Sequence, residues 1–246
     1  MKQVCLLTAG PRYVILNSIP LITLPYLHYF FIGSFLFEDG ELYRERRRFG
    51  LAAFKNLGVG KKSLEHRLNE EARHLCKVFE QQDNAFDPIP LVGNAISNII
   101  CAICFGQRFD YSDPAFNDLL SRLRENATLI SFISPANFLP SLYHTSYYAK
   151  HRENVATTKA FIEGIVEEHK KTFDRSDLRD IIDMYIDEIK RQKEEGSKVV
   201  FSDASMWRSI FDLFGAGSDT TTNTLIWGLM FLCYDPSIQT KVCIGK

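Results

Sequence analysis

The sequence predicts a mainly α-helical fold, and three observations carry that prediction. Apolar residues recur at helical spacing in one segment after another from residue 38 onward. No run of residues alternates apolar and polar side chains as a half-buried strand would, and no repeat of solenoid length is present. Glycine and proline clusters separate the periodic segments. With 246 residues, 46% of them apolar, the chain can bury a sizeable helical core.

The first four expected helices cover residues 41–56, 63–82, 91–105 and 116–130. The first is basic and amphipathic and ends before Gly58 and Gly60, because glycine commonly terminates helices. The second carries apolar residues at helical spacing, and the third is apolar nearly all round, which predicts a buried helix. A turn-rich link over residues 106–114 leads to the fourth.

Two more amphipathic helices are expected over residues 147–173 and 177–195. Before them, Pro135 and Pro140 bracket an aromatic connection that interrupts regular structure. After them, Gly196-Ser197-Lys198 forms a linker. Residues 203–234 then form the last and longest helix.

Residues 1–37 are expected to form an apolar N-terminal segment distinct from residues 38–246. Residues 13–36 carry no charged side chain and are long enough to span a bilayer, although Pro20 and Pro25 interrupt a regular helix. Three alternatives stay open: a spanning segment, a segment that lies in the membrane interface, and a buried part of the globular fold. The first two place this segment in contact with a membrane.

The charge and cysteine content exclude two classes of protein. The chain has 29 basic and 30 acidic residues, and this net charge of -1 argues against a nucleic-acid partner. Its six cysteines are too few and too scattered for a disulfide scaffold. Cys101 and Cys104 form a C-x-x-C pair inside an apolar run with no second pair at metal-ligand spacing, so we expect them in the core.

The longest helix has an unusual centre. Ser202 or Asp203 is the expected N-cap and Asp235-Pro236 the expected stop, which leaves about 30 residues and a length of about 45 Å. Residues 215–224 place two glycines, an acid and a threonine run in the middle of this helix. Each glycine costs about 0.8–1.0 kcal/mol relative to alanine, so a structural helix would avoid them.

Two interpretations of this centre are open on spacing alone. In the first, Ala216 and Thr220 share one face beside a ligand, and Asp219 next to Thr220 supplies the carboxylate and hydroxyl that a proton relay needs. In the second, this is a kinked packing helix whose threonine hydroxyls bond back to carbonyls of the preceding turn.

Residues 216–221, Ala-Gly-Ser-Asp-Thr-Thr, resemble the A-G-x-D/E-T-T signature that cytochrome P450 enzymes carry on a very long central helix. Residues 39–49 resemble the D-G-x-x-W-x-x-x-R-R-F helix of the same family. Three further stretches are similar to its family-2, microsomal branch, namely residues 57–65, 105–111 and 177–183. The resemblance covers about residues 38–242 and implies a partial P450 domain, from about helix C through helix I, incomplete at both ends.

The resemblance implies a haem cofactor (heme, iron protoporphyrin) and assigns residues to it by position. Arg47 matches the arginine that holds haem propionates, and Tyr43 stands at the tryptophan position that does the same. Arg44 and Arg46 are expected on a solvated basic helix face, the alternative being contact with an acidic redox partner.

On the long helix, the resemblance implies two catalytic residues and two that shape the cofactor site. Thr220 would hydrogen-bond the oxygen that haem activates, and Asp219 would help to deliver protons. Ala216 and Gly217 would leave room for oxygen. The implied activity is that of a monooxygenase, which inserts one oxygen atom into lipophilic small molecules such as xenobiotics, fatty acids or steroids. The implied partner is a flavoprotein reductase, and the implied location is the cytosolic face of the endoplasmic reticulum membrane.

The printed sequence lacks the part of the family pattern that supplies the metal ligand. Family members continue to an E-x-x-R helix and a loop whose cysteine thiolate is the axial ligand, whereas the printed chain ends at Lys246. Cys243 is the only late cysteine, and only Cys243 and Gly245 match the loop, so we do not expect Cys243 to be the ligand. We therefore expect an incomplete haem site and an inactive chain as printed. The alternative to a monooxygenase is a truncated, catalytically inactive product without the cysteine-ligand loop.

Overall fold

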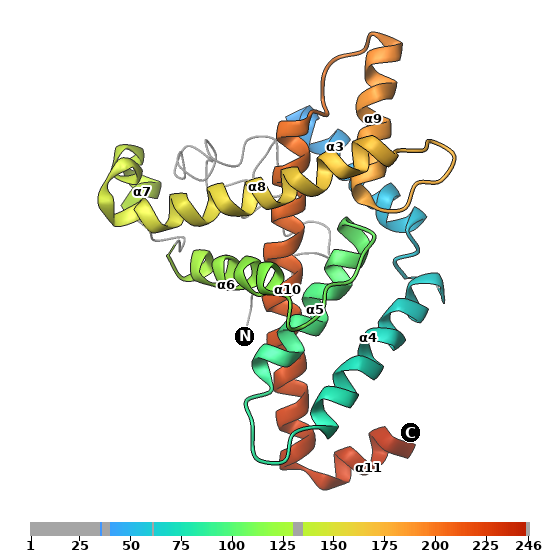
Figure 1. Cartoon of the computed structure of the whole chain (residues 1–246), viewed down its shortest axis with the longest axis vertical. Helices are drawn as coiled ribbons and strands as arrows, with labels where there is room; N and C mark the ends of the chain where they lie inside the picture. The colour runs from blue at the N-terminus through green and yellow to red at the C-terminus, as the bar shows by residue number, and fades with distance from the viewer. Residues whose placement is uncertain (1–34, 36–39, 61, 130–134, 245–246) are drawn as a thin grey trace.

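The computed structural model describes residues 35, 40–60, 62–129 and 135–244, and these residues form helices joined by turns, with no strand among them (Figure 1). The predicted mainly α-helical fold is confirmed. The uncharged segment 13–36 lies outside the described residues except for Phe35, so the three alternatives for it stay open. Among the described helices, none combines the length and the apolar character needed to cross a membrane.

The observed helices follow the predicted order, and their ends differ from prediction by a few residues. The expectation that residues 203–234 form the last helix is wrong, because Pro236 begins a further short helix. The long helix has the predicted bounds. In the connection before residue 147, Pro135 and Pro140 each begin a short helix, where irregular chain was expected. In chain order the elements are α3 (Gly40–Asn56), α4 (Lys62–Glu80), α5 (Ile89–Cys104), α6 (Pro114–Leu129), α7 (Pro135–Phe138), the 3₁₀ turns η2 (Pro140–His144) and η3 (Ser146–Tyr148), α8 (Ala149–Thr172), α9 (Ile181–Glu195), α10 (Asp203–Tyr234) and α11 (Pro236–Ile244).

Helix α10 is the axis of the described structure. It runs through the middle of the view, with α8 crossing its upper part, the end of α6 reaching it near mid-height and α5 packed along it (Figure 1). Ser202 is its N-cap: the Ser202 hydroxyl accepts from the Ser205 backbone N–H, and Ser205 accepts from the Ser202 N–H in a reciprocal capping box. The helix continues without a break through both glycines at its centre. A mid-helix ligand site is therefore built on one rigid element.

An aromatic cluster joins the link after α5 to the centre of α10. Phe105 stacks on Phe214 with ring centroids 5.3 Å apart, and Phe109 stacks on Phe116 at 5.2 Å. Phe161 of α8 contacts both Phe105 and Phe109. Because three helices and the link meet in this cluster, it determines how α6 and α8 lie across α10.

The C-x-x-C pair belongs to the core, as predicted. Cys101 and Cys104 are free thiols with no exposed surface, and burial raises the pKa of both. A thiol that cannot ionise is a poor metal ligand and a poor nucleophile. These two residues therefore act as small apolar side chains of α5.

The last turns of α10 expose large apolar side chains within the described structure. Trp227, Phe231 and Tyr234 are 59%, 61% and 89% exposed. By contrast, Phe214 and Thr222, nearer the centre of the same helix, are 2% and 5% exposed. The described helices therefore cover the first two thirds of α10 much more completely than its last third.

Candidate functional site

The predicted catalytic residues lie together on the accessible side of α10. Thr220 donates its hydroxyl proton to the Ala216 carbonyl oxygen at 2.6 Å, so these two residues share one face as predicted. Thr220 is exposed, and the neighbouring Asp219 is half-buried. No hydrogen bond or ion pair engages the Asp219 carboxylate within the described part of the chain. A carboxylate and a hydroxyl with remaining acceptor capacity therefore stand side by side at mid-helix.

The hydrogen bonds predicted by the packing-helix interpretation are also present. Thr222 donates to the Ser218 carbonyl at 2.8 Å, and Thr224 donates to the Thr220 carbonyl at the same distance. These bonds fix the threonine rotamers. They do not interrupt the helix and do not involve Asp219, so they are compatible with a functional role for this acid.

The opposite side of α10 packs closely against α5, and glycines make that approach possible. A Cβ added at Gly217 would lie 2.7 Å from Cδ1 of Ile100, and one added at Gly93 would lie 2.6 Å from Nη2 of Arg124 and 3.8 Å from Thr222. A Cβ at Gly215 would meet no heavy atom within 4 Å in the described structure. The small size of Gly217 is thus required by helix packing. Thr220, on the face that it shares with Ala216, stays exposed in the described structure.

The predicted propionate-binding residues form a pair on α3. Nη1 of Arg47 donates to the Tyr43 hydroxyl at 2.8 Å, and the guanidinium carbon lies 6.0 Å from the Tyr43 ring centroid. Arg47 is exposed and Tyr43 is half-buried. Two hydrogen-bond donors one turn apart, one of them a planar cation, suit a carboxylate partner.

The expectation of a solvated Arg46 is wrong. Arg46 is only 6% exposed, and its Nε and Nη2 donate to the Val200 carbonyl at 3.1 and 2.6 Å. Gln192 holds the same segment from the other side, because its side-chain oxygen accepts from the backbone N–H groups of Val200 and Phe201. Arg46 thus supplies hydrogen bonds to a backbone carbonyl in the segment before α10, and it links α3 to that segment. Arg44, in contrast, is exposed as expected.

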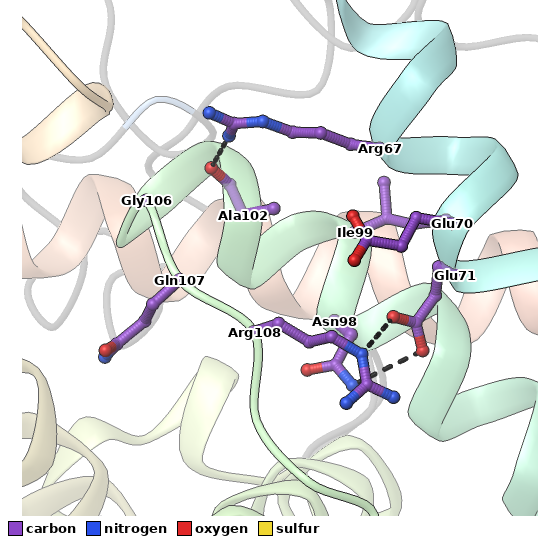
Figure 2. A pocket seen from close by; sticks show the side chains of 9 residues that line it. All are labelled: Arg67, Glu70, Glu71, Asn98, Ile99, Ala102, Gly106, Gln107 and Arg108. Carbon is purple, nitrogen blue, oxygen red and sulfur yellow. Dashed lines mark hydrogen bonds and ion pairs between the residues drawn. The ribbon is translucent and has the colours of Figure 1, made fainter. Parts of the chain in front are cut away.

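A separate polar cavity of about 190 Å³ lies between α4, α5 and the link after α5 (Figure 2). None of the predicted site residues lines it. Glu71 is 4% exposed and accepts from Arg108 Nε at 2.7 Å and from the Tyr111 hydroxyl at 2.5 Å. Arg67 donates to the Ala102 carbonyl at 2.7 Å (Figure 2). These donors and acceptors pair with one another, so the cavity wall is an anchoring network.

This network was not among the predicted sites, although the sequence carries one signal for it. Asn98 stands within the apolar run of α5, and a buried amide needs partners. Its Oδ1 accepts from the Phe109 N–H and its Nδ2 donates to the Phe109 carbonyl, both at 2.9 Å. The amide thus fixes the backbone of the link that carries the aromatic cluster.

Cys243 lies in α11, so its backbone is helical. The family pattern places the axial cysteine in a loop, and residues 236–244 form a helix directly after the Asp235-Pro236 stop. That Cys243 is not the haem ligand stays a prediction.

The fold and the site define a class: a helical core with one long central helix that carries an acid–alcohol pair, and a separate helix, α3, that carries a Tyr–Arg pair. The comparisons show which family this is. The family model described as cytochrome P450 matches residues 22–243, and the chain belongs to the cytochrome P450 family.

Individual relatives agree with this assignment. The chain is 36% identical to cytochrome P450 2J2 of Homo sapiens, over 87% of this chain and 44% of the relative. It is 34% identical to cytochrome P450 2J1 of Oryctolagus cuniculus over 97% and 51%, and 35% identical to cytochrome P450 2U1 of Mus musculus over 82% and 39%. The chain thus spans about half the length of the curated relatives it matches.

The family implies a haem cofactor, and the residues present fit one. The Tyr43–Arg47 pair offers donors for carboxylates, and the accessible face of α10 carries only small side chains at its centre. A Cβ added at Gly215, next to Ala216, would meet no heavy atom within 4 Å among the described residues.

Proposed function

We propose that this chain provides the substrate-side helical core of a haem-dependent monooxygenase that inserts one oxygen atom into lipophilic small molecules. The observation that carries the proposal is the pair formed by Asp219 and Thr220 on the accessible face of an unbroken α10. Membership of the cytochrome P450 family supports the reaction class. Xenobiotics, fatty acids and steroids are the substrate classes we infer.

Haem, when bound, supplies the oxygen chemistry, and the chain supplies position and protons. Arg47 and Tyr43 hold the haem carboxylates through charge-assisted hydrogen bonds. The small Ala216 leaves room beside the helix. The Thr220 hydroxyl proton is held by the Ala216 carbonyl, so the Thr220 oxygen is oriented to accept a hydrogen bond from the ligand side. Asp219 exchanges protons with solvent and passes them toward Thr220.

The partners follow from the same proposal. A flavoprotein reductase supplies electrons and docks on a basic surface that includes the exposed Arg44 and Arg48 of α3. Residues 1–37 form the membrane-contacting segment and residues 38–246 the partial P450 domain. We infer that the protein lies on the cytosolic face of the endoplasmic reticulum membrane.

Haem binding by the full chain tests the cofactor part of the proposal. Titration with haem should give a saturable absorption change, and Arg47→Leu should weaken binding about 10- to 100-fold, since a charge-assisted hydrogen bond contributes about 1.5–3 kcal/mol. Arg44→Leu is the matched control on the same helix and should bind as the wild type does. Equal affinities for the two variants would remove Arg47 from its role. Cys243→Ala should leave the spectrum unchanged, and a changed spectrum would make Cys243 a ligand.

Oxygen consumption tests the catalytic part. In the printed chain extended by the E-x-x-R helix and the cysteine-ligand loop of the family, loaded with haem and supplied with reductase and NADPH, Thr220→Ala should divert consumed oxygen to peroxide while haem affinity stays unchanged. Thr224→Ala, which removes the same kind of back-bonded hydroxyl one turn later, is the control. If Thr220→Ala keeps the wild-type ratio of product to oxygen, Thr220 has no role in the reaction. If the wild-type chain binds haem but consumes no oxygen, the catalytically inactive alternative holds.

A further inference from the structure

A buried histidine and a buried aspartate join the end of α8 to the start of α9, outside the site described above. Nε2 of His169 lies 2.7 Å from Oδ2 of Asp180, across the turn that connects the two helices. The two residues are 9% and 1% exposed. Asp180 is also the N-cap of α9, because its Oδ1 accepts from the Asp183 backbone N–H at 2.9 Å. This contact therefore determines where α9 begins.

The hydrogen-bond geometry requires a proton between these two side chains. Nδ1 of His169 lies 2.9 Å from the Ile165 carbonyl oxygen, which can only accept, so Nδ1 carries a proton. If Nε2 carried none and the Asp180 carboxylate were ionised, two lone pairs would face each other at 2.7 Å. The short contact is favourable only when a proton occupies it, either as imidazolium with carboxylate or as neutral imidazole with carboxylic acid.

We propose that His169 and Asp180 form a proton-operated latch that holds the α8–α9 turn closed while they share a proton and loosens it when that proton leaves at alkaline pH. A neutral His169 has one ring proton for two acceptors, so one of its nitrogens then faces either the Asp180 carboxylate or the Ile165 carbonyl oxygen with no proton between them. This buried repulsive contact relaxes when the His169 ring shifts and the turn over residues 173–180 moves or admits water.

The charged groups around the pair favour a shared proton over a metal ion. One donor atom each from His169, Asp180 and Asp183 lies within 4.8 Å of the others. Arg179 already engages both oxygens of Asp183, at 2.6 and 2.9 Å, and both oxygens of Asp180 already accept hydrogen bonds. From α5, the neighbouring titratable group is the Cys104 thiol. On the α10 side, Asp203 binds Lys170.

The balance of these groups gives the direction of the pH response. Burial lowers the pKa of His169, but the hydrogen bond and the charge of Asp180 outweigh it, so the net pKa is raised above the usual 6.5. A histidine with a raised folded pKa contributes stability that is fully present below pH 6.5 and is lost as pH rises through the folded value. Backbone packing reinforces the pair, since a Cβ at Gly106 would lie 2.8 Å from Oδ2 of Asp180.

Nitrogen-15 NMR of the histidine-labelled full chain tests the shared proton directly. Between pH 6 and 9.5, His169 should show two protonated nitrogens at the acidic end and titrate above pH 6.5, identified by its loss in His169→Gln. The exposed His66 supplies a second histidine signal for comparison in the same spectra. Titration of His169 at or below pH 6.5 would overturn the latch. The measurement is made on the wild-type chain, and His169→Gln is used only to assign the signal.

Hydrogen exchange tests the movement. After correction for intrinsic rates, amides over residues 173–183 should lose at least tenfold protection as pH rises through the His169 titration. His169→Gln, whose amide can donate to Asp180 without titrating, should remove this step, and His66→Gln should retain it. If the step persists in His169→Gln, or if the wild type shows none while His169 titrates, the latch is wrong.

Discussion

Two glycines, two positions apart in α10, should respond oppositely to the same substitution. Gly217 lies against α5, where a Cβ would approach Cδ1 of Ile100 to 2.7 Å and Cγ1 to 3.3 Å, whereas a Cβ at Gly215 meets nothing within 4 Å in the described structure. Both positions gain the same helix propensity on change to alanine, about 0.8–1.0 kcal/mol. The difference between the two variants therefore isolates the packing of α5 on α10.

The expected magnitudes follow from these distances. Gly215→Ala should stabilise the chain by about 0.5–1 kcal/mol. Gly217→Ala must displace Ile100, and overpacking of this kind costs about 1–3 kcal/mol, so the net change should be about 0–2 kcal/mol destabilising. The gap between the two variants is about 1–3 kcal/mol.

Urea unfolding followed by far-ultraviolet circular dichroism measures both variants. Ile100→Val removes the colliding Cδ1 atom, so the double variant Gly217→Ala, Ile100→Val should recover about 1 kcal/mol or more beyond additivity. A Gly217→Ala variant as stable as Gly215→Ala, with additive behaviour in the double variant, would refute the close helix contact.

Three further predictions concern buried titratable groups. Burial and the adjacent Arg152 guanidinium lower the pKa of His151 to about 4. The free energy of unfolding should therefore fall by about 2–3 kcal/mol as pH drops from 6.5 toward 4, because the unfolded chain gains a proton that the folded chain does not. His151→Gln should remove this fall from the pH profile of stability measured by urea unfolding. Glu71→Gln should cost about 1–3 kcal/mol in urea unfolding by leaving Arg108 without its carboxylate, while Glu70→Gln should change stability by less than about 0.5 kcal/mol. Iodoacetamide at pH 8 should modify the exposed Cys76 in the native chain, and Cys104 only after unfolding, which mass spectrometry of the peptides would show.

The helices and the face shared by Ala216 and Thr220 could be predicted because their causes are local. Apolar periodicity, caps and breakers act within a few residues, so α10 has its predicted bounds of Asp203 and Tyr234. The i, i+4 relation of Ala216 and Thr220 follows from helix geometry alone. Short sequence motifs likewise predicted the family, and the family match confirms this prediction.

What each helix face meets depended on the tertiary structure. Arg46 and Arg47 are adjacent and chemically identical, yet Arg46 is buried on the Val200 carbonyl and Arg47 is exposed beside Tyr43. Gly217 faces α5, although its motif alone indicated only a need for small size. Spacing along the chain determines which residues share a face, but the partner of that face comes from residues tens to hundreds of positions away. Which residues a helix face contacts is therefore determined by long-range packing, in which buried polar groups must also be hydrogen-bonded.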